Sequence, residues 1–158
     1  MKSLVISPHP DDEVLGAGGT LFKRKKSKKS NLLYWIIVTK LKTNTPKKII
    51  LKKSNEIKKV AKFFGFKKVF QLNFTTTELD SSSKKKLISD FSSIFNKIKP
   101  NELFVPHFSD VHSDHKIVSE VISTCTKNFR FSFIKKILAY EVLSETDYNL
   151  NRKQIFFP

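Results

Sequence analysis

Residues 4–13 read LVISPHPDDE and contain the first element of the predicted fold. Its first four residues, Leu4 to Ser7, are a short apolar run that predicts a buried strand, which Pro8 and Pro10 then end. A helical pattern begins at Glu13 and continues to about Lys26. A buried strand is therefore followed closely by a helix.

The same alternation continues along the chain. Further strands are expected at 32–38, 68–72, 103–105 and 137–143, and further helices at 46–65, 81–99 and 115–128. Strands and helices that alternate at this spacing predict a Rossmann-like, three-layer α/β/α fold with a mostly parallel sheet. The 158 residues are enough for one such domain.

Composition excludes several classes of protein. The net charge is +16, but 39% of the residues are hydrophobic, which is too apolar for a disordered polycation. One cysteine, Cys125, excludes a disulfide framework and is expected in the core. No apolar run is long enough to span a membrane or to form a signal peptide, so a cytoplasmic domain is expected.

The lysines that produce the charge are spread along the whole chain. Such a charge can indicate a polyanionic partner, or it can reflect the lysine-rich usage of AT-rich codons. The wide spread favours the second interpretation, because nucleic-acid-binding proteins concentrate charge on one face. We therefore expect no specific nucleic-acid partner, while a peripheral contact with an anionic membrane stays compatible with the sequence.

Reactive side chains follow two of the expected strands. SPHPDDE at 7–13 follows the first strand, PHFSDVHSDH at 106–115 follows a later one, and together they contain all 4 histidines. Loops that leave the carboxyl ends of strands in an open α/β sheet line one crevice. The two loops are therefore expected to meet.

Two imidazoles and one carboxylate form a zinc site that leaves one position open for water. His9 and Asp12 are close enough on a tight turn to bind one ion, and either His112 or His115 supplies the third ligand. The spacing alone does not decide between these two histidines. Zinc in such a site makes hydroxide available at neutral pH.

The remaining groups have roles beside such a metal. Asp11 is a candidate general base, and the second histidine of the later loop is a candidate acid or oxyanion donor whose tautomer Asp114 would set. The acidic residues 11–13 can also be explained as helix N-capping. Gly16, Gly18 and Gly19 lack dinucleotide-binding spacing and are interpreted as sites of close packing.

These motifs resemble a known family. Residues 7–13 followed by LGAGGT at 15–20 are similar to the signature of the PIG-L/LmbE-type zinc N-acetylglucosaminyl deacetylases. HSDH at 112–115 resembles that family's second element, Asp110 also matches, and Tyr140-Glu141-Val142 is similar to a further segment. The resemblance implies a Rossmann-like fold and hydrolysis of an N-acetyl group from a small or lipid-linked amino sugar.

The resemblance also implies a role for each matching residue. It makes His9, Asp12 and His115 the ligands of zinc or of another divalent metal, and Asp11 the general base. His112 would stabilise the oxyanion or protonate the leaving amine, with Asp114 orienting it.

Two departures from the family pattern affect the expectations. Lys53, three residues before Glu56, stands where relatives use a substrate-binding Arg, and Lys has no planar fork. Relatives also continue beyond the point where this chain ends at Pro158, so residues 1–158 are expected to be one deacetylase domain without its C-terminal segment.

Two other functions remain as alternatives. A truncated or degenerate relative would act as a basic binding protein for nucleic acid or anionic lipid. A phosphoesterase would use similar ligands, together with a second metal and further carboxylates that the sequence does not offer.

Overall fold

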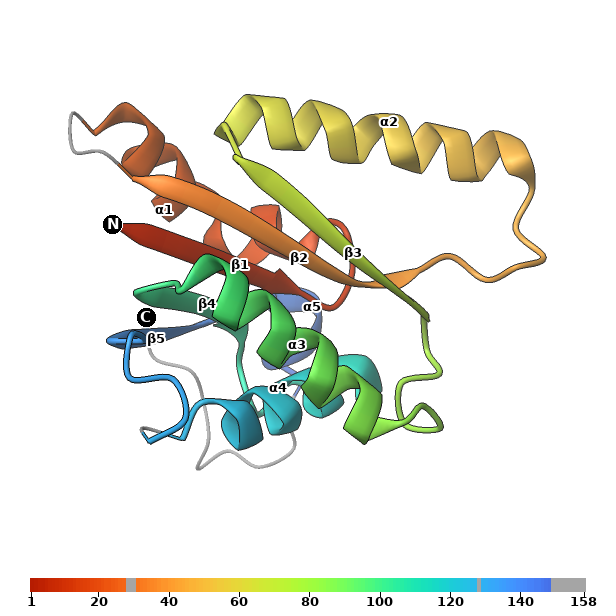
Figure 1. Ribbon diagram of the computed structural model, residues 1–158. Coiled ribbons are helices and arrows are strands. Elements are labelled where there is room, and N and C mark those ends of the chain that lie inside the picture. The colour runs from red at the N-terminus through yellow and green to blue at the C-terminus, as the bar shows by residue number, and fades with distance from the viewer. Residues whose placement is uncertain (28–30, 128, 149–158) are drawn as a thin grey trace.

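The computed structural model describes residues 1–27, 31–127 and 129–148. These residues include a five-stranded sheet in the order β3-β2-β1-β4-β5, in which every neighbouring pair is parallel (Figure 1). The strands are β1 (Lys2–Ser7), β2 (Leu32–Lys40), β3 (Lys68–Thr75), β4 (Glu102–Pro106) and β5 (Lys136–Tyr140). The expected Rossmann-like α/β fold is confirmed.

Helices cover both faces of the sheet (Figure 1). They are α1 (Asp12–Lys26), α2 (Lys47–Phe64), α3 (Lys84–Ile98), α4 (Ser113–Cys125) and the short α5 (Leu143–Thr146). On β2, Leu33, Trp35 and Ile37 pack with α1 and α2, whereas the alternate residues pack with α3 and α4. Both faces of the central strand β2 are buried, which explains why its sequence is continuously apolar from Leu32 to Val38.

Several predicted boundaries differ from the observed ones. The strand predicted at 137–143 ends at Tyr140, because the Val142 carbonyl accepts hydrogen bonds from the Glu145 and Thr146 N–H groups and starts α5 instead. The helix predicted at 115–128 begins earlier, at Ser113, with His112 as its N-cap. It ends at Cys125, and the predicted end at Asn128 lies outside the described residues.

The close packing expected at the glycines of α1 is found at Gly16. A Cβ atom there would lie 2.2 Å from Tyr140 Cδ2 and 2.8 Å from the Glu141 carbonyl oxygen. A Cβ built at Gly19 would meet no atom within 4 Å apart from its chain neighbours and the backbone of its own helix, so packing does not explain that glycine. Cys125 is fully buried, as expected.

The strand order brings the two reactive loops together. β1 and β4 are hydrogen-bonded neighbours at the point where the strand order reverses, so their carboxyl ends open side by side. Open α/β sheets bind ligands at this position. Within the described part of the chain, no helix has both the length and the apolar character needed to cross a bilayer.

Candidate metal centre

Three side chains from the two loops converge on one point. His9 Nδ1 lies 3.3 Å from His115 Nε2, although the two residues are 106 positions apart. Asp12 Oδ2 lies 3.4 Å from His115 Nε2 and 3.6 Å from His9 Nδ1. The side chains of Asp12 and His115 are almost completely buried, and that of His9 is 18% exposed.

These spacings fit a tetrahedral metal ion. Zinc binds nitrogen and oxygen ligands at about 2.0–2.2 Å, which separates neighbouring ligand atoms in a tetrahedron by about 3.3–3.6 Å. The three distances among His9, Asp12 and His115 fall in that range. Two imidazole nitrogens and one carboxylate oxygen are also the chemical types that zinc prefers.

The Asp114 carboxylate orients the ring of His9. His9 Nε2 lies 2.9 Å from Asp114 Oδ2, and Asp114 also accepts hydrogen bonds from the backbone N–H groups of Thr77 and Leu79. Burial would raise the pKa of Asp114, but the hydrogen bonds from His9, Thr77 and Leu79 outweigh burial and lower it. The ionised carboxylate therefore places the ring proton of a neutral His9 on Nε2, which leaves the Nδ1 lone pair facing the cluster.

His115 is held in a similar way from the opposite side. Its Nδ1 lies 2.7 Å from Asp110 Oδ2, and the second oxygen of that buried carboxylate contacts the Thr146 hydroxyl. Burial would lower the pKa of His115, but hydrogen bonds to Asp110 and Asp12 raise it to about 9. The metal-free ring is therefore protonated at neutral pH, and a bound cation would replace the proton on Nε2.

His112 lies beside these two histidines but is hydrogen-bonded differently. His9, His112 and His115 form a group that could hold a metal ion, with one ring nitrogen of each within 4.8 Å of the others. However, His112 Nδ1 accepts a hydrogen bond from the Asp114 N–H at 3.1 Å. Burial, followed by the neighbouring His9 and His115, lowers the pKa of His112, so its neutral ring carries the proton on Nε2.

One sequence-based expectation is therefore corrected. The Asp114 carboxylate was expected to orient His112, but it binds His9, and only the Asp114 backbone N–H contacts the His112 ring. The reason is that His112 is the N-cap of α4, where its ring accepts one of the free N–H groups of the first turn.

The capping interpretation of the acidic residues is not supported by their side-chain contacts. Asp11 occupies the N-cap position of α1, but its side chain makes no capping hydrogen bond. Asp12 accepts from the His9 N–H at 2.7 Å instead. Burial raises the pKa of Glu13 to about 8, so this carboxyl is largely protonated at neutral pH.

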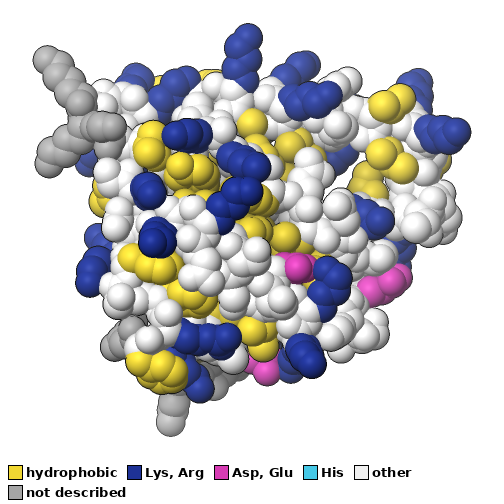
Figure 2. All heavy atoms as spheres, in the orientation of Figure 1, with side chains coloured by type: hydrophobic (Ala, Val, Ile, Leu, Met, Phe, Trp, Pro, Cys, Tyr) yellow, Lys and Arg dark blue, Asp and Glu magenta, His cyan; other side chains and the backbone are white. Residues whose placement is uncertain are grey.

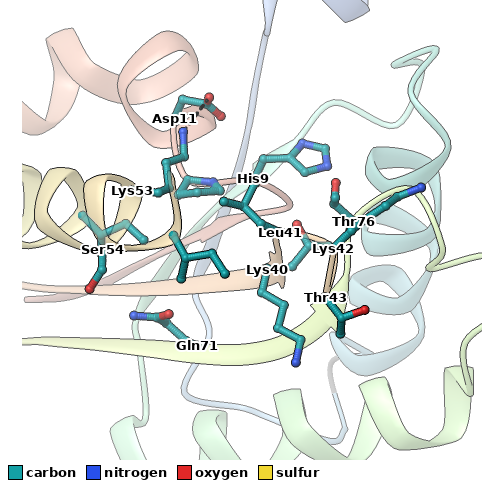
Figure 3. Close-up of a pocket in the computed structure, with 14 residues that line it drawn as sticks. His9, Asp11, Lys40, Leu41, Lys42, Thr43, Lys53, Ser54, Gln71 and Thr76 are labelled. Carbon is teal, nitrogen blue, oxygen red and sulfur yellow. Dashed lines mark hydrogen bonds and ion pairs between the residues drawn. The ribbon is translucent and has the colours of Figure 1, made fainter. Parts of the chain in front are cut away.

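A cavity of about 490 Å³ opens next to the cluster, at the ends of β1, β2 and β3 and against α2 (Figure 3). His9, Asp11 and Lys53 all line it. Lys53 extends from α2 toward Asp11, with 3.5 Å between Nζ and Oδ2, and 54% of the Asp11 side chain is exposed (Figure 3). The structure thus brings the expected base and the expected substrate-binding lysine to the cavity beside the cluster.

Several lining residues were missed by the sequence analysis. Hydroxyl and amide side chains line the cavity at Thr43, Ser54, Gln71 and Thr76, and Lys40 points away from the Asp11 end (Figure 3). Those at the ends of β2 and β3 could have been expected, because ligands of open α/β sheets bind at the carboxyl ends of the strands.

Two residues that hold His115 were not assigned this role from the sequence. Asp110 was noticed without a role, and nothing in the sequence pointed to Thr146. His107 is not part of the three-histidine group, and its Nδ1 lies 2.5 Å from Ser109 Oγ.

The fold and this cluster define an LmbE-like, Rossmann-type protein with a candidate metal centre at the switch point of the sheet. The sequence model of the PIG-L family, described as GlcNAc-PI de-N-acetylase, matches residues 4–126, and the chain belongs to this family.

Individual relatives agree with this assignment. The chain is 27% identical to a diacetylchitobiose deacetylase of Thermococcus kodakarensis over 73% of its own length and 45% of that protein. The N,N'-diacetylchitobiose deacetylase of Pyrococcus horikoshii has the same fold, with a TM-score of 0.70 and 23% identity over 90% of this chain and 61% of that one. The chain therefore spans about half the length of the curated relative that it matches.

The fold by itself does not define one reaction. A 4-carboxy-2-hydroxymuconate hydratase from Pseudomonas putida shares it with a TM-score of 0.63 and 18% identity, over 81% of this chain and 58% of that one. The function must therefore be argued from the side chains of the site.

Proposed function

We propose that this chain carries the catalytic centre of a metal-dependent deacetylase that removes the acetyl group from an N-acetylated amino sugar. The observation that carries the proposal is the set of 3.3–3.6 Å distances among His9 Nδ1, Asp12 Oδ2 and His115 Nε2. Family membership and the deacetylases among the relatives support it.

His9, Asp12 and His115 would hold the metal, which we propose to be zinc. When bound, zinc would polarise the acetyl carbonyl and lower the pKa of water enough to supply hydroxide near neutral pH. The hydrogen bonds from His9 to Asp114 and from His115 to Asp110 support this ligand set, because in each ring they leave the nitrogen that faces Asp12 available to a metal. Such carboxylate partners also make the imidazoles more basic ligands.

Asp11 is the proposed general base. It is adjacent to the ligand Asp12 in sequence, half-exposed, and lines the cavity, so its carboxylate can accept the proton of the attacking water. The Lys53 ammonium lies 3.5 Å from this carboxylate. Lys53 also lines the cavity and is proposed to contact the substrate there.

His112 is the proposed electrophile. Its Nδ1 is occupied by the Asp114 N–H, so Nε2–H can donate a hydrogen bond to the carbonyl oxygen as it becomes negatively charged. The amine nitrogen takes up the proton that Asp11 has accepted from water when the C–N bond breaks, which yields acetate and a free amino sugar. The low pKa of the ring, caused first by burial, keeps His112 neutral and suits it to donating a hydrogen bond rather than a proton.

The cavity has the size and lining of a sugar subsite. Its 490 Å³ lies within the range of small-molecule sites, and Thr43, Ser54, Gln71 and Thr76 offer partners for sugar hydroxyls. Leu41, Ile50 and Ile57 supply apolar contacts. We therefore propose an N-acetylglucosamine conjugate as the substrate class, and residues 1–158 as a single deacetylase domain.

Metal content and acetate release test this function together. Purified protein should bind one zinc ion per chain and release acetate from N-acetylglucosamine or N,N'-diacetylchitobiose, with the activity lost on chelation and restored by zinc. Asp11→Asn should keep the metal and slow turnover by about 10²–10⁴-fold. Asp90→Asn, an Asp on α3 paired with Lys86, is the matched control and should turn over normally. Protein that binds no divalent metal, or full turnover in Asp11→Asn, would contradict the proposal.

A further inference from the structure

Exposed apolar side chains gather along the seam between α1 and α2. Val14, Leu15 and Phe22 on α1 are 42%, 66% and 39% exposed, and Phe63 on α2 is 53% exposed. The rings of Phe22 and Phe63 stack with 6.0 Å between centroids, so the two helices share one apolar surface at this end. We call these four residues the α1–α2 face.

Lysines border this face closely. The Lys26 ammonium lies 4.4 Å from the Phe22 ring centroid, and that of Lys25 lies 5.1 Å from the Phe63 centroid and donates to the Phe63 carbonyl. Lys59 and Lys62 are also exposed, within one turn of Phe63 on α2. The two acidic residues of α1, Asp12 and Glu13, are buried. Asp11 and Glu56 are exposed at the opposite end of the seam, beside Val14 and Leu15. The solvent-facing side near Phe22 and Phe63 therefore combines apolar groups with positive charge.

The α1–α2 face is continuous with the candidate site. A second cavity of about 260 Å³ lies between the helices and is lined by Val14, Leu15 and Trp35. It shares Asp11, Lys53 and other residues with the larger cavity that reaches His9. The two cavities thus connect the exposed face with the candidate site, past the Asp11–Lys53 ion pair.

We propose that the α1–α2 face docks on an anionic phospholipid bilayer. Exposed aliphatic and aromatic groups can enter the interface while adjacent lysines bind lipid phosphates, and these two contributions together give stable peripheral binding. A nucleic acid would attract the lysines but would leave Val14 and Leu15 in water, because aliphatic side chains gain little from a phosphate backbone. That docking would present a lipid-linked amino sugar to His9 is a consequence that rests on the proposed function.

Bulk charge must be separated from this specific face. Lysines and arginines are also scattered over the opposite side of the molecule, where α3 and α4 lie (Figure 2). Lys25→Glu/Lys26→Glu reverses the charge of two lysines that border the α1–α2 face, whereas Lys85→Glu/Lys97→Glu reverses the charge at two exposed positions on α3. Both double variants have the same net charge, so a difference between them reports the location of the charge.

Sedimentation with vesicles tests the proposal. The protein should bind vesicles of phosphatidylcholine with one-third phosphatidylglycerol at physiological salt, and bind pure phosphatidylcholine much more weakly. Lys25→Glu/Lys26→Glu should weaken binding about tenfold or more, and Lys85→Glu/Lys97→Glu only slightly. Leu15→Ser/Phe63→Ser should weaken it several-fold, with Phe129→Ser, at an exposed aromatic outside the face, as its control.

Three results would overturn the proposal: no binding to the anionic vesicles, equal losses in the two charge variants, or displacement of the protein from vesicles by a single-stranded oligonucleotide at equal phosphate concentration. Circular dichroism of each variant checks folding. Acetate release from a soluble substrate is measured separately, so an inactive protein that still binds vesicles would refute the proposed function and leave membrane docking supported.

Discussion

The Nε2 atom of His9 lies 2.9 Å from the carboxylate of Asp114, a residue 105 positions further along the chain. This contact joins the loop after β1 to the first turn of α4. Asp114 is itself held by the backbone N–H groups of Thr77 and Leu79, in the segment after β3. Three segments of the chain therefore determine which nitrogen of His9 faces Asp12 and His115 in the candidate metal centre.

Asp114→Asn should weaken zinc binding by about 10–100-fold, because a neutral amide accepts a weaker hydrogen bond from His9 Nε2–H than the charged carboxylate does. Competition with a chromophoric chelator measures this affinity. Asp90→Asn should leave the affinity unchanged, since Asp90 lies on α3 and forms its ion pair with Lys86. An unaltered zinc affinity in Asp114→Asn would show that this carboxylate does not orient a ligand.

His115→Gln and His112→Gln should separate binding from chemistry. His115→Gln should lose most of the zinc, because Nε2 of His115 is a proposed ligand atom. His112→Gln should retain zinc and lower kcat by about 10²–10³-fold, because it removes only a donor to the oxyanion. Metal analysis and steady-state kinetics on the two proteins are the measurements. If His112→Gln lost the metal and His115→Gln kept it, the proposed roles would have to be exchanged.

The buried carboxyl of Glu13 should make stability depend on pH. Burial raises its pKa from an ordinary value of 4.5 to about 8. Between these two values the unfolded chain releases the proton while the folded protein keeps it, so the free energy of unfolding falls as pH rises, by roughly 2–5 kcal/mol over the window. Below pH 4.5 both states are protonated and this contribution is fully present.

Glu13→Gln removes this titration. The free energy of unfolding of Glu13→Gln minus that of the wild type should increase from pH 5 to pH 8, as measured by urea denaturation of the metal-free proteins. Glu56→Gln changes an exposed glutamate of α2 and should give a nearly constant difference. A constant difference for Glu13→Gln as well would mean that Glu13 is ionised in the folded protein.

Gly16→Ala should destabilise the fold, whereas Gly19→Ala should not. The added methyl group at Gly16 would lie 2.2 Å from the Tyr140 ring, and overpacking of this kind costs about 1–3 kcal/mol. At Gly19 the methyl group meets open space, and the better helix propensity of Ala should stabilise α1 by about 0.5–1 kcal/mol. Chemical denaturation of both variants measures the two changes, and similar stabilities would show that Gly16 can move away from Tyr140.

Sequence patterns predicted the strands and helices of the core well and their ends less well. The end of β5 was misplaced because Val142 and Leu143 are as apolar as the strand before them. The strand ends because the Val142 carbonyl accepts a hydrogen bond from the Glu145 N–H and not from a neighbouring strand. The start of α4 was placed too late because its N-cap is a histidine, a residue that rarely marks a helix start.

The sequence alone was enough to predict the class of fold and the side chains of the candidate metal centre. Alternating apolar and amphipathic segments require a buried parallel sheet, and its strand ends carry His9, Asp11, Asp12 and the later histidines. Only the tertiary structure decided which ring atoms meet. A histidine presents one nitrogen or the other according to its hydrogen-bond partner. The partners are Asp114 for His9 and Asp110 for His115, and they are brought into place by the packing of the loops after β1, β3 and β4. Sequence spacing contains no information about that packing, so it could name the histidines but could not orient them.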